Sequence, residues 1–183
     1  MLYNGAMYIL GSSLTNLPIL SLQSGQPIAF VASPIIKSEN LEIVAIFLQS
    51  GTWRKNSAVI LARDIREITR EGLIIDSLDD IEDAAEIVRL QAVINQKFNP
   101  LGALVVDQSG NNLGKVEDYT VDAMTYKIQK LYLKQSLLKN MLLNNVIIDR
   151  SQIIDIQPTK IVVRDTSIKE SHGALAARPI PQE

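Results

Sequence analysis

Apolar residues along this chain come in short runs separated by turn sequences, a pattern typical of β-strands. The runs at residues 19–22 and 103–106 are each followed by a Ser-Gly pair, where glycine supplies the positive φ of a tight hairpin. The longest β-rich stretches, Glu42–Leu48 and residues 127–133, are expected to be central strands. The other predicted strands are residues 28–31, 113–121, 58–61, 146–148, 73–75 and 161–163.

This pattern occurs twice. Residues 24–31 resemble residues 109–116, and residues 43–48 fall on 128–133, both at an offset of 85. After a loop the offset becomes 88, which places residues 60–68 on 148–156 and 73–75 on 161–163. Three additional residues in one loop explain the change. A repeat of this length is a whole small domain, so the sequence predicts two copies of one module.

The stretch between the copies has helical spacing. Ser77 and Asp80 form a predicted capping box. Further acidic residues come next in the sequence, and negative charge there is favourable at the positive end of a helix dipole. Apolar residues then recur at intervals of three and four. We therefore expect a helix over residues 78–96, packed on the modules with Ile81, Val88 and Leu90 buried.

Composition narrows the function class. Aromatic residues make up only 5% of the chain against 46% hydrophobic residues, so the cores must be aliphatic, and the absence of cysteine excludes disulfides and thiolate chemistry. Residues 17–76 carry 6 basic and 6 acidic side chains, and residues 101–166 carry 8 and 7. Neither copy has the basic excess of a dedicated nucleic-acid binder. No signal peptide or transmembrane run is evident, so we expect a cytoplasmic protein without direct membrane insertion.

Repeat 2 resembles a PRC-barrel domain. The resemblance rests on Leu-Gly-Lys-Val-Glu-Asp at residues 113–118, Val-Asp at 121–122 and the Ile-rich segment 146–156. Repeat 1 departs from it, with Ala29 in place of Gly114 and Ser33 in place of Asp118. The family occurs in the cytoplasmic part of the photosynthetic reaction centre H subunit and in a ribosome maturation factor. The resemblance implies a scaffold and brings no catalytic residue.

The resulting fold prediction is mainly β, with two tandem small PRC-like β-barrels joined by one α-helix. Residues 1–76 form repeat 1, 77–100 a helical linker, 101–166 repeat 2 and 167–183 a flexible tail. We expect Gly114 to sit where a side chain would crowd the facing backbone.

Candidate partner-binding residues are few. Trp53 and Arg54 combine an aromatic side chain with a cation in a loop, as expected for an interface anchor. They are also consistent with an apolar side chain that closes the end of a barrel beside a cation that extends to solvent. The predicted central strand of repeat 2 carries a row of lysines, where repeat 1 has Glu42, Ala45 and Gln49. These lysines are Lys127, Lys130 and Lys134.

Other chemistry lacks support. The lone His172 has no second ligand for a metal site and no partner for nucleophilic catalysis, and we predict no cofactor. The sequence thus favours a non-enzymatic protein–protein interaction or scaffold module. Two alternatives stay open: an RNA- or ribosome-associated assembly factor, and a small-ligand-binding protein that uses the cleft between the barrels. Self-association stays open as well.

Overall fold

The computed structural model describes residues 7–49, 57–134 and 146–164, which are mainly β-strand with one α-helix. The first half contains β1 (Tyr8–Leu10), β2 (Pro18–Ser21), β3 (Gln26–Lys37), β4 (Glu42–Leu48), β5 (Ala58–Leu61), β6 (Ile65–Ile68), β7 (Leu73–Ile75), β8 (Ile81–Asp83) and α1 (Val88–Asn95). The second half contains β9 (Leu104–Asp107), β10 (Asn112–Asp122), β11 (Ile128–Lys134), β12 (Val146–Asp149), β13 (Ile153–Ile156) and β14 (Lys160–Val163). Short 3-10 turns are η1 (Gly11–Leu14), η2 (Ala62–Asp64), η3 (Leu78–Asp80), η4 (Ala84–Glu86) and η5 (Arg150–Gln152).

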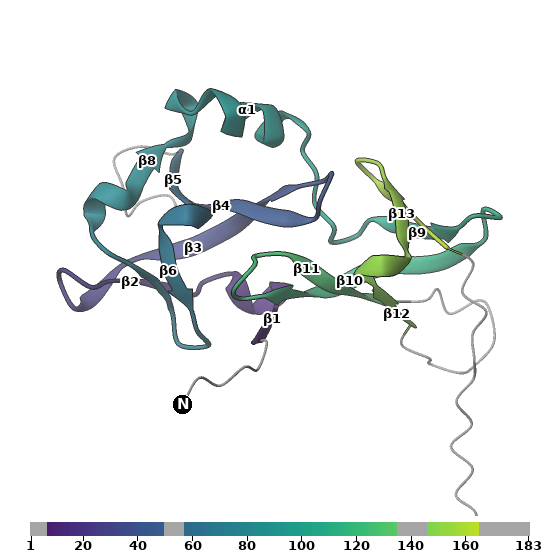
Figure 1. Cartoon of the computed structure of the whole chain (residues 1–183), viewed down its shortest axis with the longest axis horizontal. Helices are drawn as coiled ribbons and strands as arrows, with labels where there is room; N and C mark the ends of the chain where they lie inside the picture. The colour runs from purple at the N-terminus through teal and green to yellow at the C-terminus, as the bar shows by residue number, and fades with distance from the viewer. Residues whose placement is uncertain (1–6, 50–56, 135–145, 165–183) are drawn as a thin grey trace, which may run out of the picture.

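The strands form two sheets (Figure 1), and the pairing gives both sheets the same strand order. The first sheet runs β6-β7-β2-β3-β4-β5-β8, and the second runs β13-β14-β9-β10-β11-β12. Val31 pairs with Leu48 as Val116 pairs with Leu133, at the predicted offset of 85. Ile65 pairs with Ile75 as Ile153 pairs with Val163, at the predicted offset of 88. The two halves therefore share one strand order, and these registers follow the predicted offsets.

Each sheet curls. β5 and β6 lie near opposite ends of the first strand order, yet only the three residues of η2 join them. β12 and β13 lie at opposite ends of the second order and are joined by the three residues of η5. Because so short a connection spans only a few ångströms, the two ends of each sheet must approach one another. The side chains on the concave side are then enclosed.

One hydrophobic core extends through both sheets. A single cluster of buried, mostly aliphatic residues includes Ile19 and Ile46 from the first sheet together with Leu131 and Ile161 from the second, all fully buried. Burying one such side chain contributes about 1.5–3 kcal/mol. The cores are aliphatic as predicted, and the two repeats pack as one apolar body.

A local two-fold relation joins the repeats at their centre. The amide of Ile43 donates to the carbonyl of Tyr126, and the amide of Ile128 donates to the carbonyl of Leu41, both at 2.8 Å. These residues are equivalent at the offset of 85, and between them Glu42 pairs with its own equivalent, Lys127. Each repeat thus offers the same surface to the other, as in a two-fold symmetric dimer.

The N-terminal segment reinforces this junction. β1 pairs antiparallel with β10 of the second sheet, so residues 8–10 cross from repeat 1 to repeat 2. The hydroxyl of Ser12 donates to Asp118 at 2.5 Å. Gly11 lies against the ring of Tyr119, where an added Cβ would come within 2.3 Å of ring carbon. The close approach explains glycine at that position.

The linker differs from its prediction. Only α1 is α-helical, while Ile81–Asp83 form β8 and pair with β5. Leu90 is buried as predicted, but Val88 is 85% exposed, so its predicted burial was wrong. The predicted capping box of Ser77 and Asp80 is present, yet it caps the short turn η3. The three residues after η3 pair with the open edge of β5, because this pairing satisfies backbone groups of both segments.

The backbone conformation of Gly114 favours glycine at this position. It has a φ of +136°, a conformation that side chains disfavour, next to a bulge in β10. Its equivalent Ala29 does not adopt a positive φ. The Ser-Gly turns agree with prediction, since Gly25 and Gly110 have φ values of +67° and +85°.

The linker provides a matched pair of tests. Leu90→Ala removes a buried side chain from the face of α1 that packs on the first sheet, and is expected to lower the free energy of unfolding by about 2–5 kcal/mol. Val88→Ala, on the exposed side of the same helix, is expected to change it by less than about 0.5 kcal/mol. Urea denaturation measures both. Equal effects of the two substitutions would show that α1 does not pack as described.

Candidate functional site

The outer face of the second sheet is the strongest candidate site. Leu131 and Leu133 of β11 are buried, so the alternating residues Lys130, Tyr132 and Lys134 point to the opposite, outer face. The pairing places further residues beside them across the sheet. We define the outer face as Lys115 and Asp118 of β10, Lys130, Tyr132 and Lys134 of β11, and Ile147 and Asp149 of β12.

The equivalent face of the first sheet is covered. There Ala45 and Leu61 form a second hydrophobic cluster with Leu90 of α1, and Figure 1 shows α1 lying across this side of the sheet. In the second sheet the residues equivalent to Ala45 and Leu61 are Lys130 and Asp149, which face each other across β11 and β12. Lys130 and Asp149 are both exposed, and α1, the single α-helix among the described residues, packs on the first sheet. Because polar residues replace apolar ones here, this face of the second sheet can be exposed without the cost of exposing apolar surface.

The charges on the outer face are balanced. Lys134 lies 3.6 Å from Glu117, and both side chains are largely exposed. The pKa of Asp149 is lowered, chiefly by a hydrogen bond from the Ser151 hydroxyl and in smaller part by the nearby Lys130. The outer face carries three lysines and two carboxylates, and Glu117 beside Lys134 supplies a third carboxylate. Exposed pairs of this kind contribute little to stability.

An apolar strip crosses this balanced surface. Tyr132 is half-buried and pairs with Ile147, whose side chain is 51% exposed. An aromatic ring beside an exposed aliphatic residue, ringed by polar groups, has the composition of a small protein-binding patch. The strip reaches β12, which pairs with β11 and with no other strand among the described residues.

The three predicted lysines are not brought together. Lys130 and Lys134 share the outer face, but Lys127 lies half-buried at the central junction opposite Glu42. Equivalent residues meet there, so identical charges in the two repeats would repel directly. Opposite charges remove that repulsion. Trp53, Arg54 and His172 lie outside the described residues.

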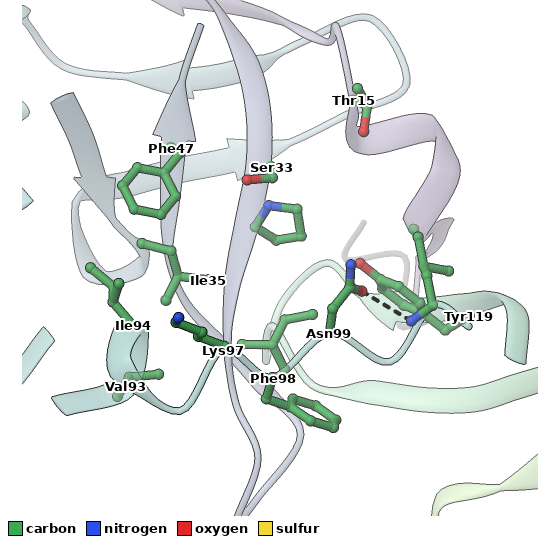
Figure 2. A pocket seen from close by; sticks show the side chains of 14 residues that line it. Thr15, Ser33, Ile35, Phe47, Val93, Ile94, Lys97, Phe98, Asn99 and Tyr119 are labelled. Atoms are coloured by element: carbon green, nitrogen blue, oxygen red, sulfur yellow. Dashed lines mark hydrogen bonds between the residues drawn. The ribbon is translucent and has the colours of Figure 1, made fainter. Parts of the chain in front are cut away.

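A cavity of about 370 Å³ lies between the repeats. Figure 2 shows Phe47 and Ile35 of the first sheet on one side, and Tyr119 of the second sheet and Thr15 on another. Lys97 and Asn99 add polar groups at its margin, and Asn99 accepts a hydrogen bond from the amide of Leu101 at 3.0 Å. Burial raises the pKa of the Tyr119 hydroxyl well above its ordinary value.

The acidic cluster of the linker serves local structure. Asp80 accepts from the backbone amides of Asp76 and Ser77, and Asp83 accepts from the Ser57 hydroxyl at 2.5 Å. Across residues 7–49, 57–134 and 146–164, no three acidic or histidine side chains gather in a way that could hold a metal ion. The single α-helix of these residues, α1, is too short to cross a membrane, which takes about 20 residues.

Comparison with known proteins assigns no family. No family model matches this chain, and no curated protein matches it at a significant level. The site is therefore interpreted from its own residues.

Sequence reasoning missed Tyr132, Ile147 and Asp149 as members of the outer face. The signal was present in the repeat itself. At the two offsets Ala45 becomes Lys130, Phe47 becomes Tyr132 and Leu61 becomes Asp149. Polar groups thus replace apolar ones on one face only.

The central charge pair can be tested by exchange. Lys127→Glu places two carboxylates opposite each other and is expected to lower the free energy of unfolding by up to about 1 kcal/mol. The exchanged variant, Glu42→Lys with Lys127→Glu, is expected to recover most of that loss. A double-mutant cycle from urea denaturation measures the coupling. A coupling energy of zero would show that the two charges do not interact.

Proposed function

We propose that this chain is a non-enzymatic interaction module, built as a tandem PRC-barrel-like scaffold, that binds another protein through the outer face of its second sheet in the cytoplasm. The observation that carries the proposal is the difference between two otherwise equivalent sheets. The first sheet buries this face beneath α1, and the second leaves it exposed with a balanced set of charges around Tyr132 and Ile147. The same strand order in both halves, and the curl of each sheet, support the tandem-barrel interpretation.

The balanced charges favour protein over nucleic acid as the partner. Binding RNA phosphates requires cations that are free to replace counterions. Here Lys134 is close to Glu117, and Lys130 lies opposite Asp149. Association with RNA or the ribosome therefore remains an alternative with less support from the surface.

The cavity between the repeats supports a second candidate function, small-ligand binding. Its volume of about 370 Å³ lies within the range of ligand pockets, and its walls combine aromatic and aliphatic side chains with a few polar groups. Native mass spectrometry of the protein purified from its own cell tests this. A bound small molecule that Ile94→Trp excludes would establish the site, and an unliganded mass in both proteins would argue against it.

Partner capture tests the principal proposal. Immobilised full-length protein is expected to retain the same partner from nuclease-treated and untreated lysates, because RNA does not mediate the contact. Tyr132→Ser with Ile147→Ser is expected to reduce capture at least tenfold while the circular dichroism spectrum stays unchanged. Met124→Ser, at an exposed turn residue away from the outer face, is the matched control. Capture that depends on RNA, or that survives the double substitution, would contradict the proposal.

The lysines of the outer face give a separate salt-dependent readout. Lys130→Glu with Lys134→Glu replaces the balance of charges by a strong acidic excess. We expect slower association with the captured partner, and we expect the difference from the wild type to shrink as salt rises from 50 to 500 mM, on the order of the screening range of exposed charges. Surface plasmon resonance measures both rates. An association rate that is unchanged at low salt would remove the lysines from the interface.

A further inference from the structure

The two sheets differ at one edge. In the first sheet the outer edge of β5 pairs with β8, which places Ile81 opposite Ile60 and Glu82 opposite Val59. The equivalent strand of the second sheet is β12, with Ile148 and Ile147 at the positions of Ile60 and Val59. No strand among the described residues pairs with the outer edge of β12. Unpaired backbone groups on a sheet edge are a template for another strand.

The sequence that follows β14 does not supply the covering elements of the first sheet. Continued past Val163, the offset of 88 places Lys169 at the position of Ile81, a partly buried residue that packs on the core. The segment at the position of α1 contains Pro179 and Pro181, and proline is strongly disfavoured inside a helix. At this offset, the sequence after Val163 does not repeat the apolar pattern of β8 or α1.

The pairing of β5 with β8 indicates what the edge of β12 accepts. The residue opposite Ile148 faces the core, because Ile148 is fully buried, and it must be apolar as Ile81 is. The next residue, opposite Ile147, faces outward on the same side of the sheet as Ile147 and Tyr132. In the first repeat this place is polar, because Glu82 occupies it. The strand runs antiparallel to β12 and needs only about three residues, the length of β8.

We propose that β12 is a strand-acceptor edge, at which a short extended segment of another protein adds antiparallel to the second sheet, with an apolar residue on the core side and a polar residue on the side of Tyr132. This inference rests on the proposed function and names the binding mode. Main-chain hydrogen bonds supply affinity in such strand addition, and alternate side chains supply specificity. The apolar strip of Tyr132 and Ile147 then lies beside the added strand.

A tethered donor strand tests the edge directly. Residues 76–86, which contain β8, are appended to the full chain through a flexible Gly-Ser linker, which gives an effective concentration on the order of millimolar. Exchange of the β12 amides that point away from β11 is expected to slow at least tenfold relative to the chain without the donor. The matched control carries Glu82→Pro in the appended copy alone, which leaves the native β8 untouched and is expected to restore fast exchange. Equal exchange in all three proteins would overturn the inference.

The same measurement distinguishes two other possible occupants of the β12 edge. Protection of β12 in the full chain that disappears when residues 165–183 are removed would assign the edge to the chain's own C-terminal segment and overturn the proposal. Protection that rises with protein concentration, together with a dimer in sedimentation velocity, would assign it to a second copy and overturn it as well. The proposal predicts fast exchange of the β12 amides that point away from β11, in both lengths of chain and at every concentration.

Partner capture separates this inference from the function on which it rests. The chain with the tethered donor is expected to capture at least tenfold less partner than the chain with the proline donor, because its edge is already paired. Equal capture by both would contradict strand addition and leave the interaction function standing. Absence of capture by the wild type would instead contradict the interaction function, while hydrogen exchange would still decide whether the edge accepts a strand.

Discussion

The shared apolar core of the two repeats is the constraint on which the rest of this structure depends. A module of 60 to 80 residues buries too little surface to be more than marginally stable, and a second copy supplies the missing burial. Residues from both sheets accordingly belong to one buried cluster. The reciprocal hydrogen bonds of Ile43 and Ile128 fix how the copies meet, and the N-terminal strand β1 crosses the junction to pair with β10.

Fusing the two copies in one chain frees equivalent positions to differ. In a symmetric dimer the residue at the axis faces itself, so a charge there is repelled by its own copy. Here Glu42 faces Lys127. The same freedom allows Ala45 and Leu61, which lie beneath α1, to correspond to Lys130 and Asp149 on an exposed face. One repeat therefore serves stability, and we propose that the other serves recognition.

Much of the fold could be predicted from the sequence because the two repeats can be aligned with each other. The offsets of 85 and 88 gave the strand equivalences, and the registers reproduce them. Local signals misled only in the linker, where the capping box of Ser77 and Asp80 starts a single turn and Ile81 enters a strand. A helix and an edge strand compete for the same residues, and the open edge of β5, which is distant in sequence, decides between them.

The site was less predictable because it too depends on contacts between residues that are distant in sequence. The lysines of β11 were visible as a charge difference between the copies, but their acidic neighbours come from β10 and β12 and are brought close only by pairing. Lys127 departs from the group because a bulge and the central junction separate it from the outer face. Whether the edge of a strand is exposed likewise depends on which strands pair. The spacing of residues along the sequence does not specify this pairing.

Hydrogen exchange after a core truncation in one repeat tests the shared core most directly. Ile46→Ala removes a fully buried side chain of the first sheet, and Leu131→Ala does the same in the second. If both repeats share one cooperative core, each substitution should accelerate exchange of the slowest amides in both sheets by the same factor, since those amides exchange through global unfolding. Acceleration confined to the sheet that carries the substitution would show two independent units and contradict the account.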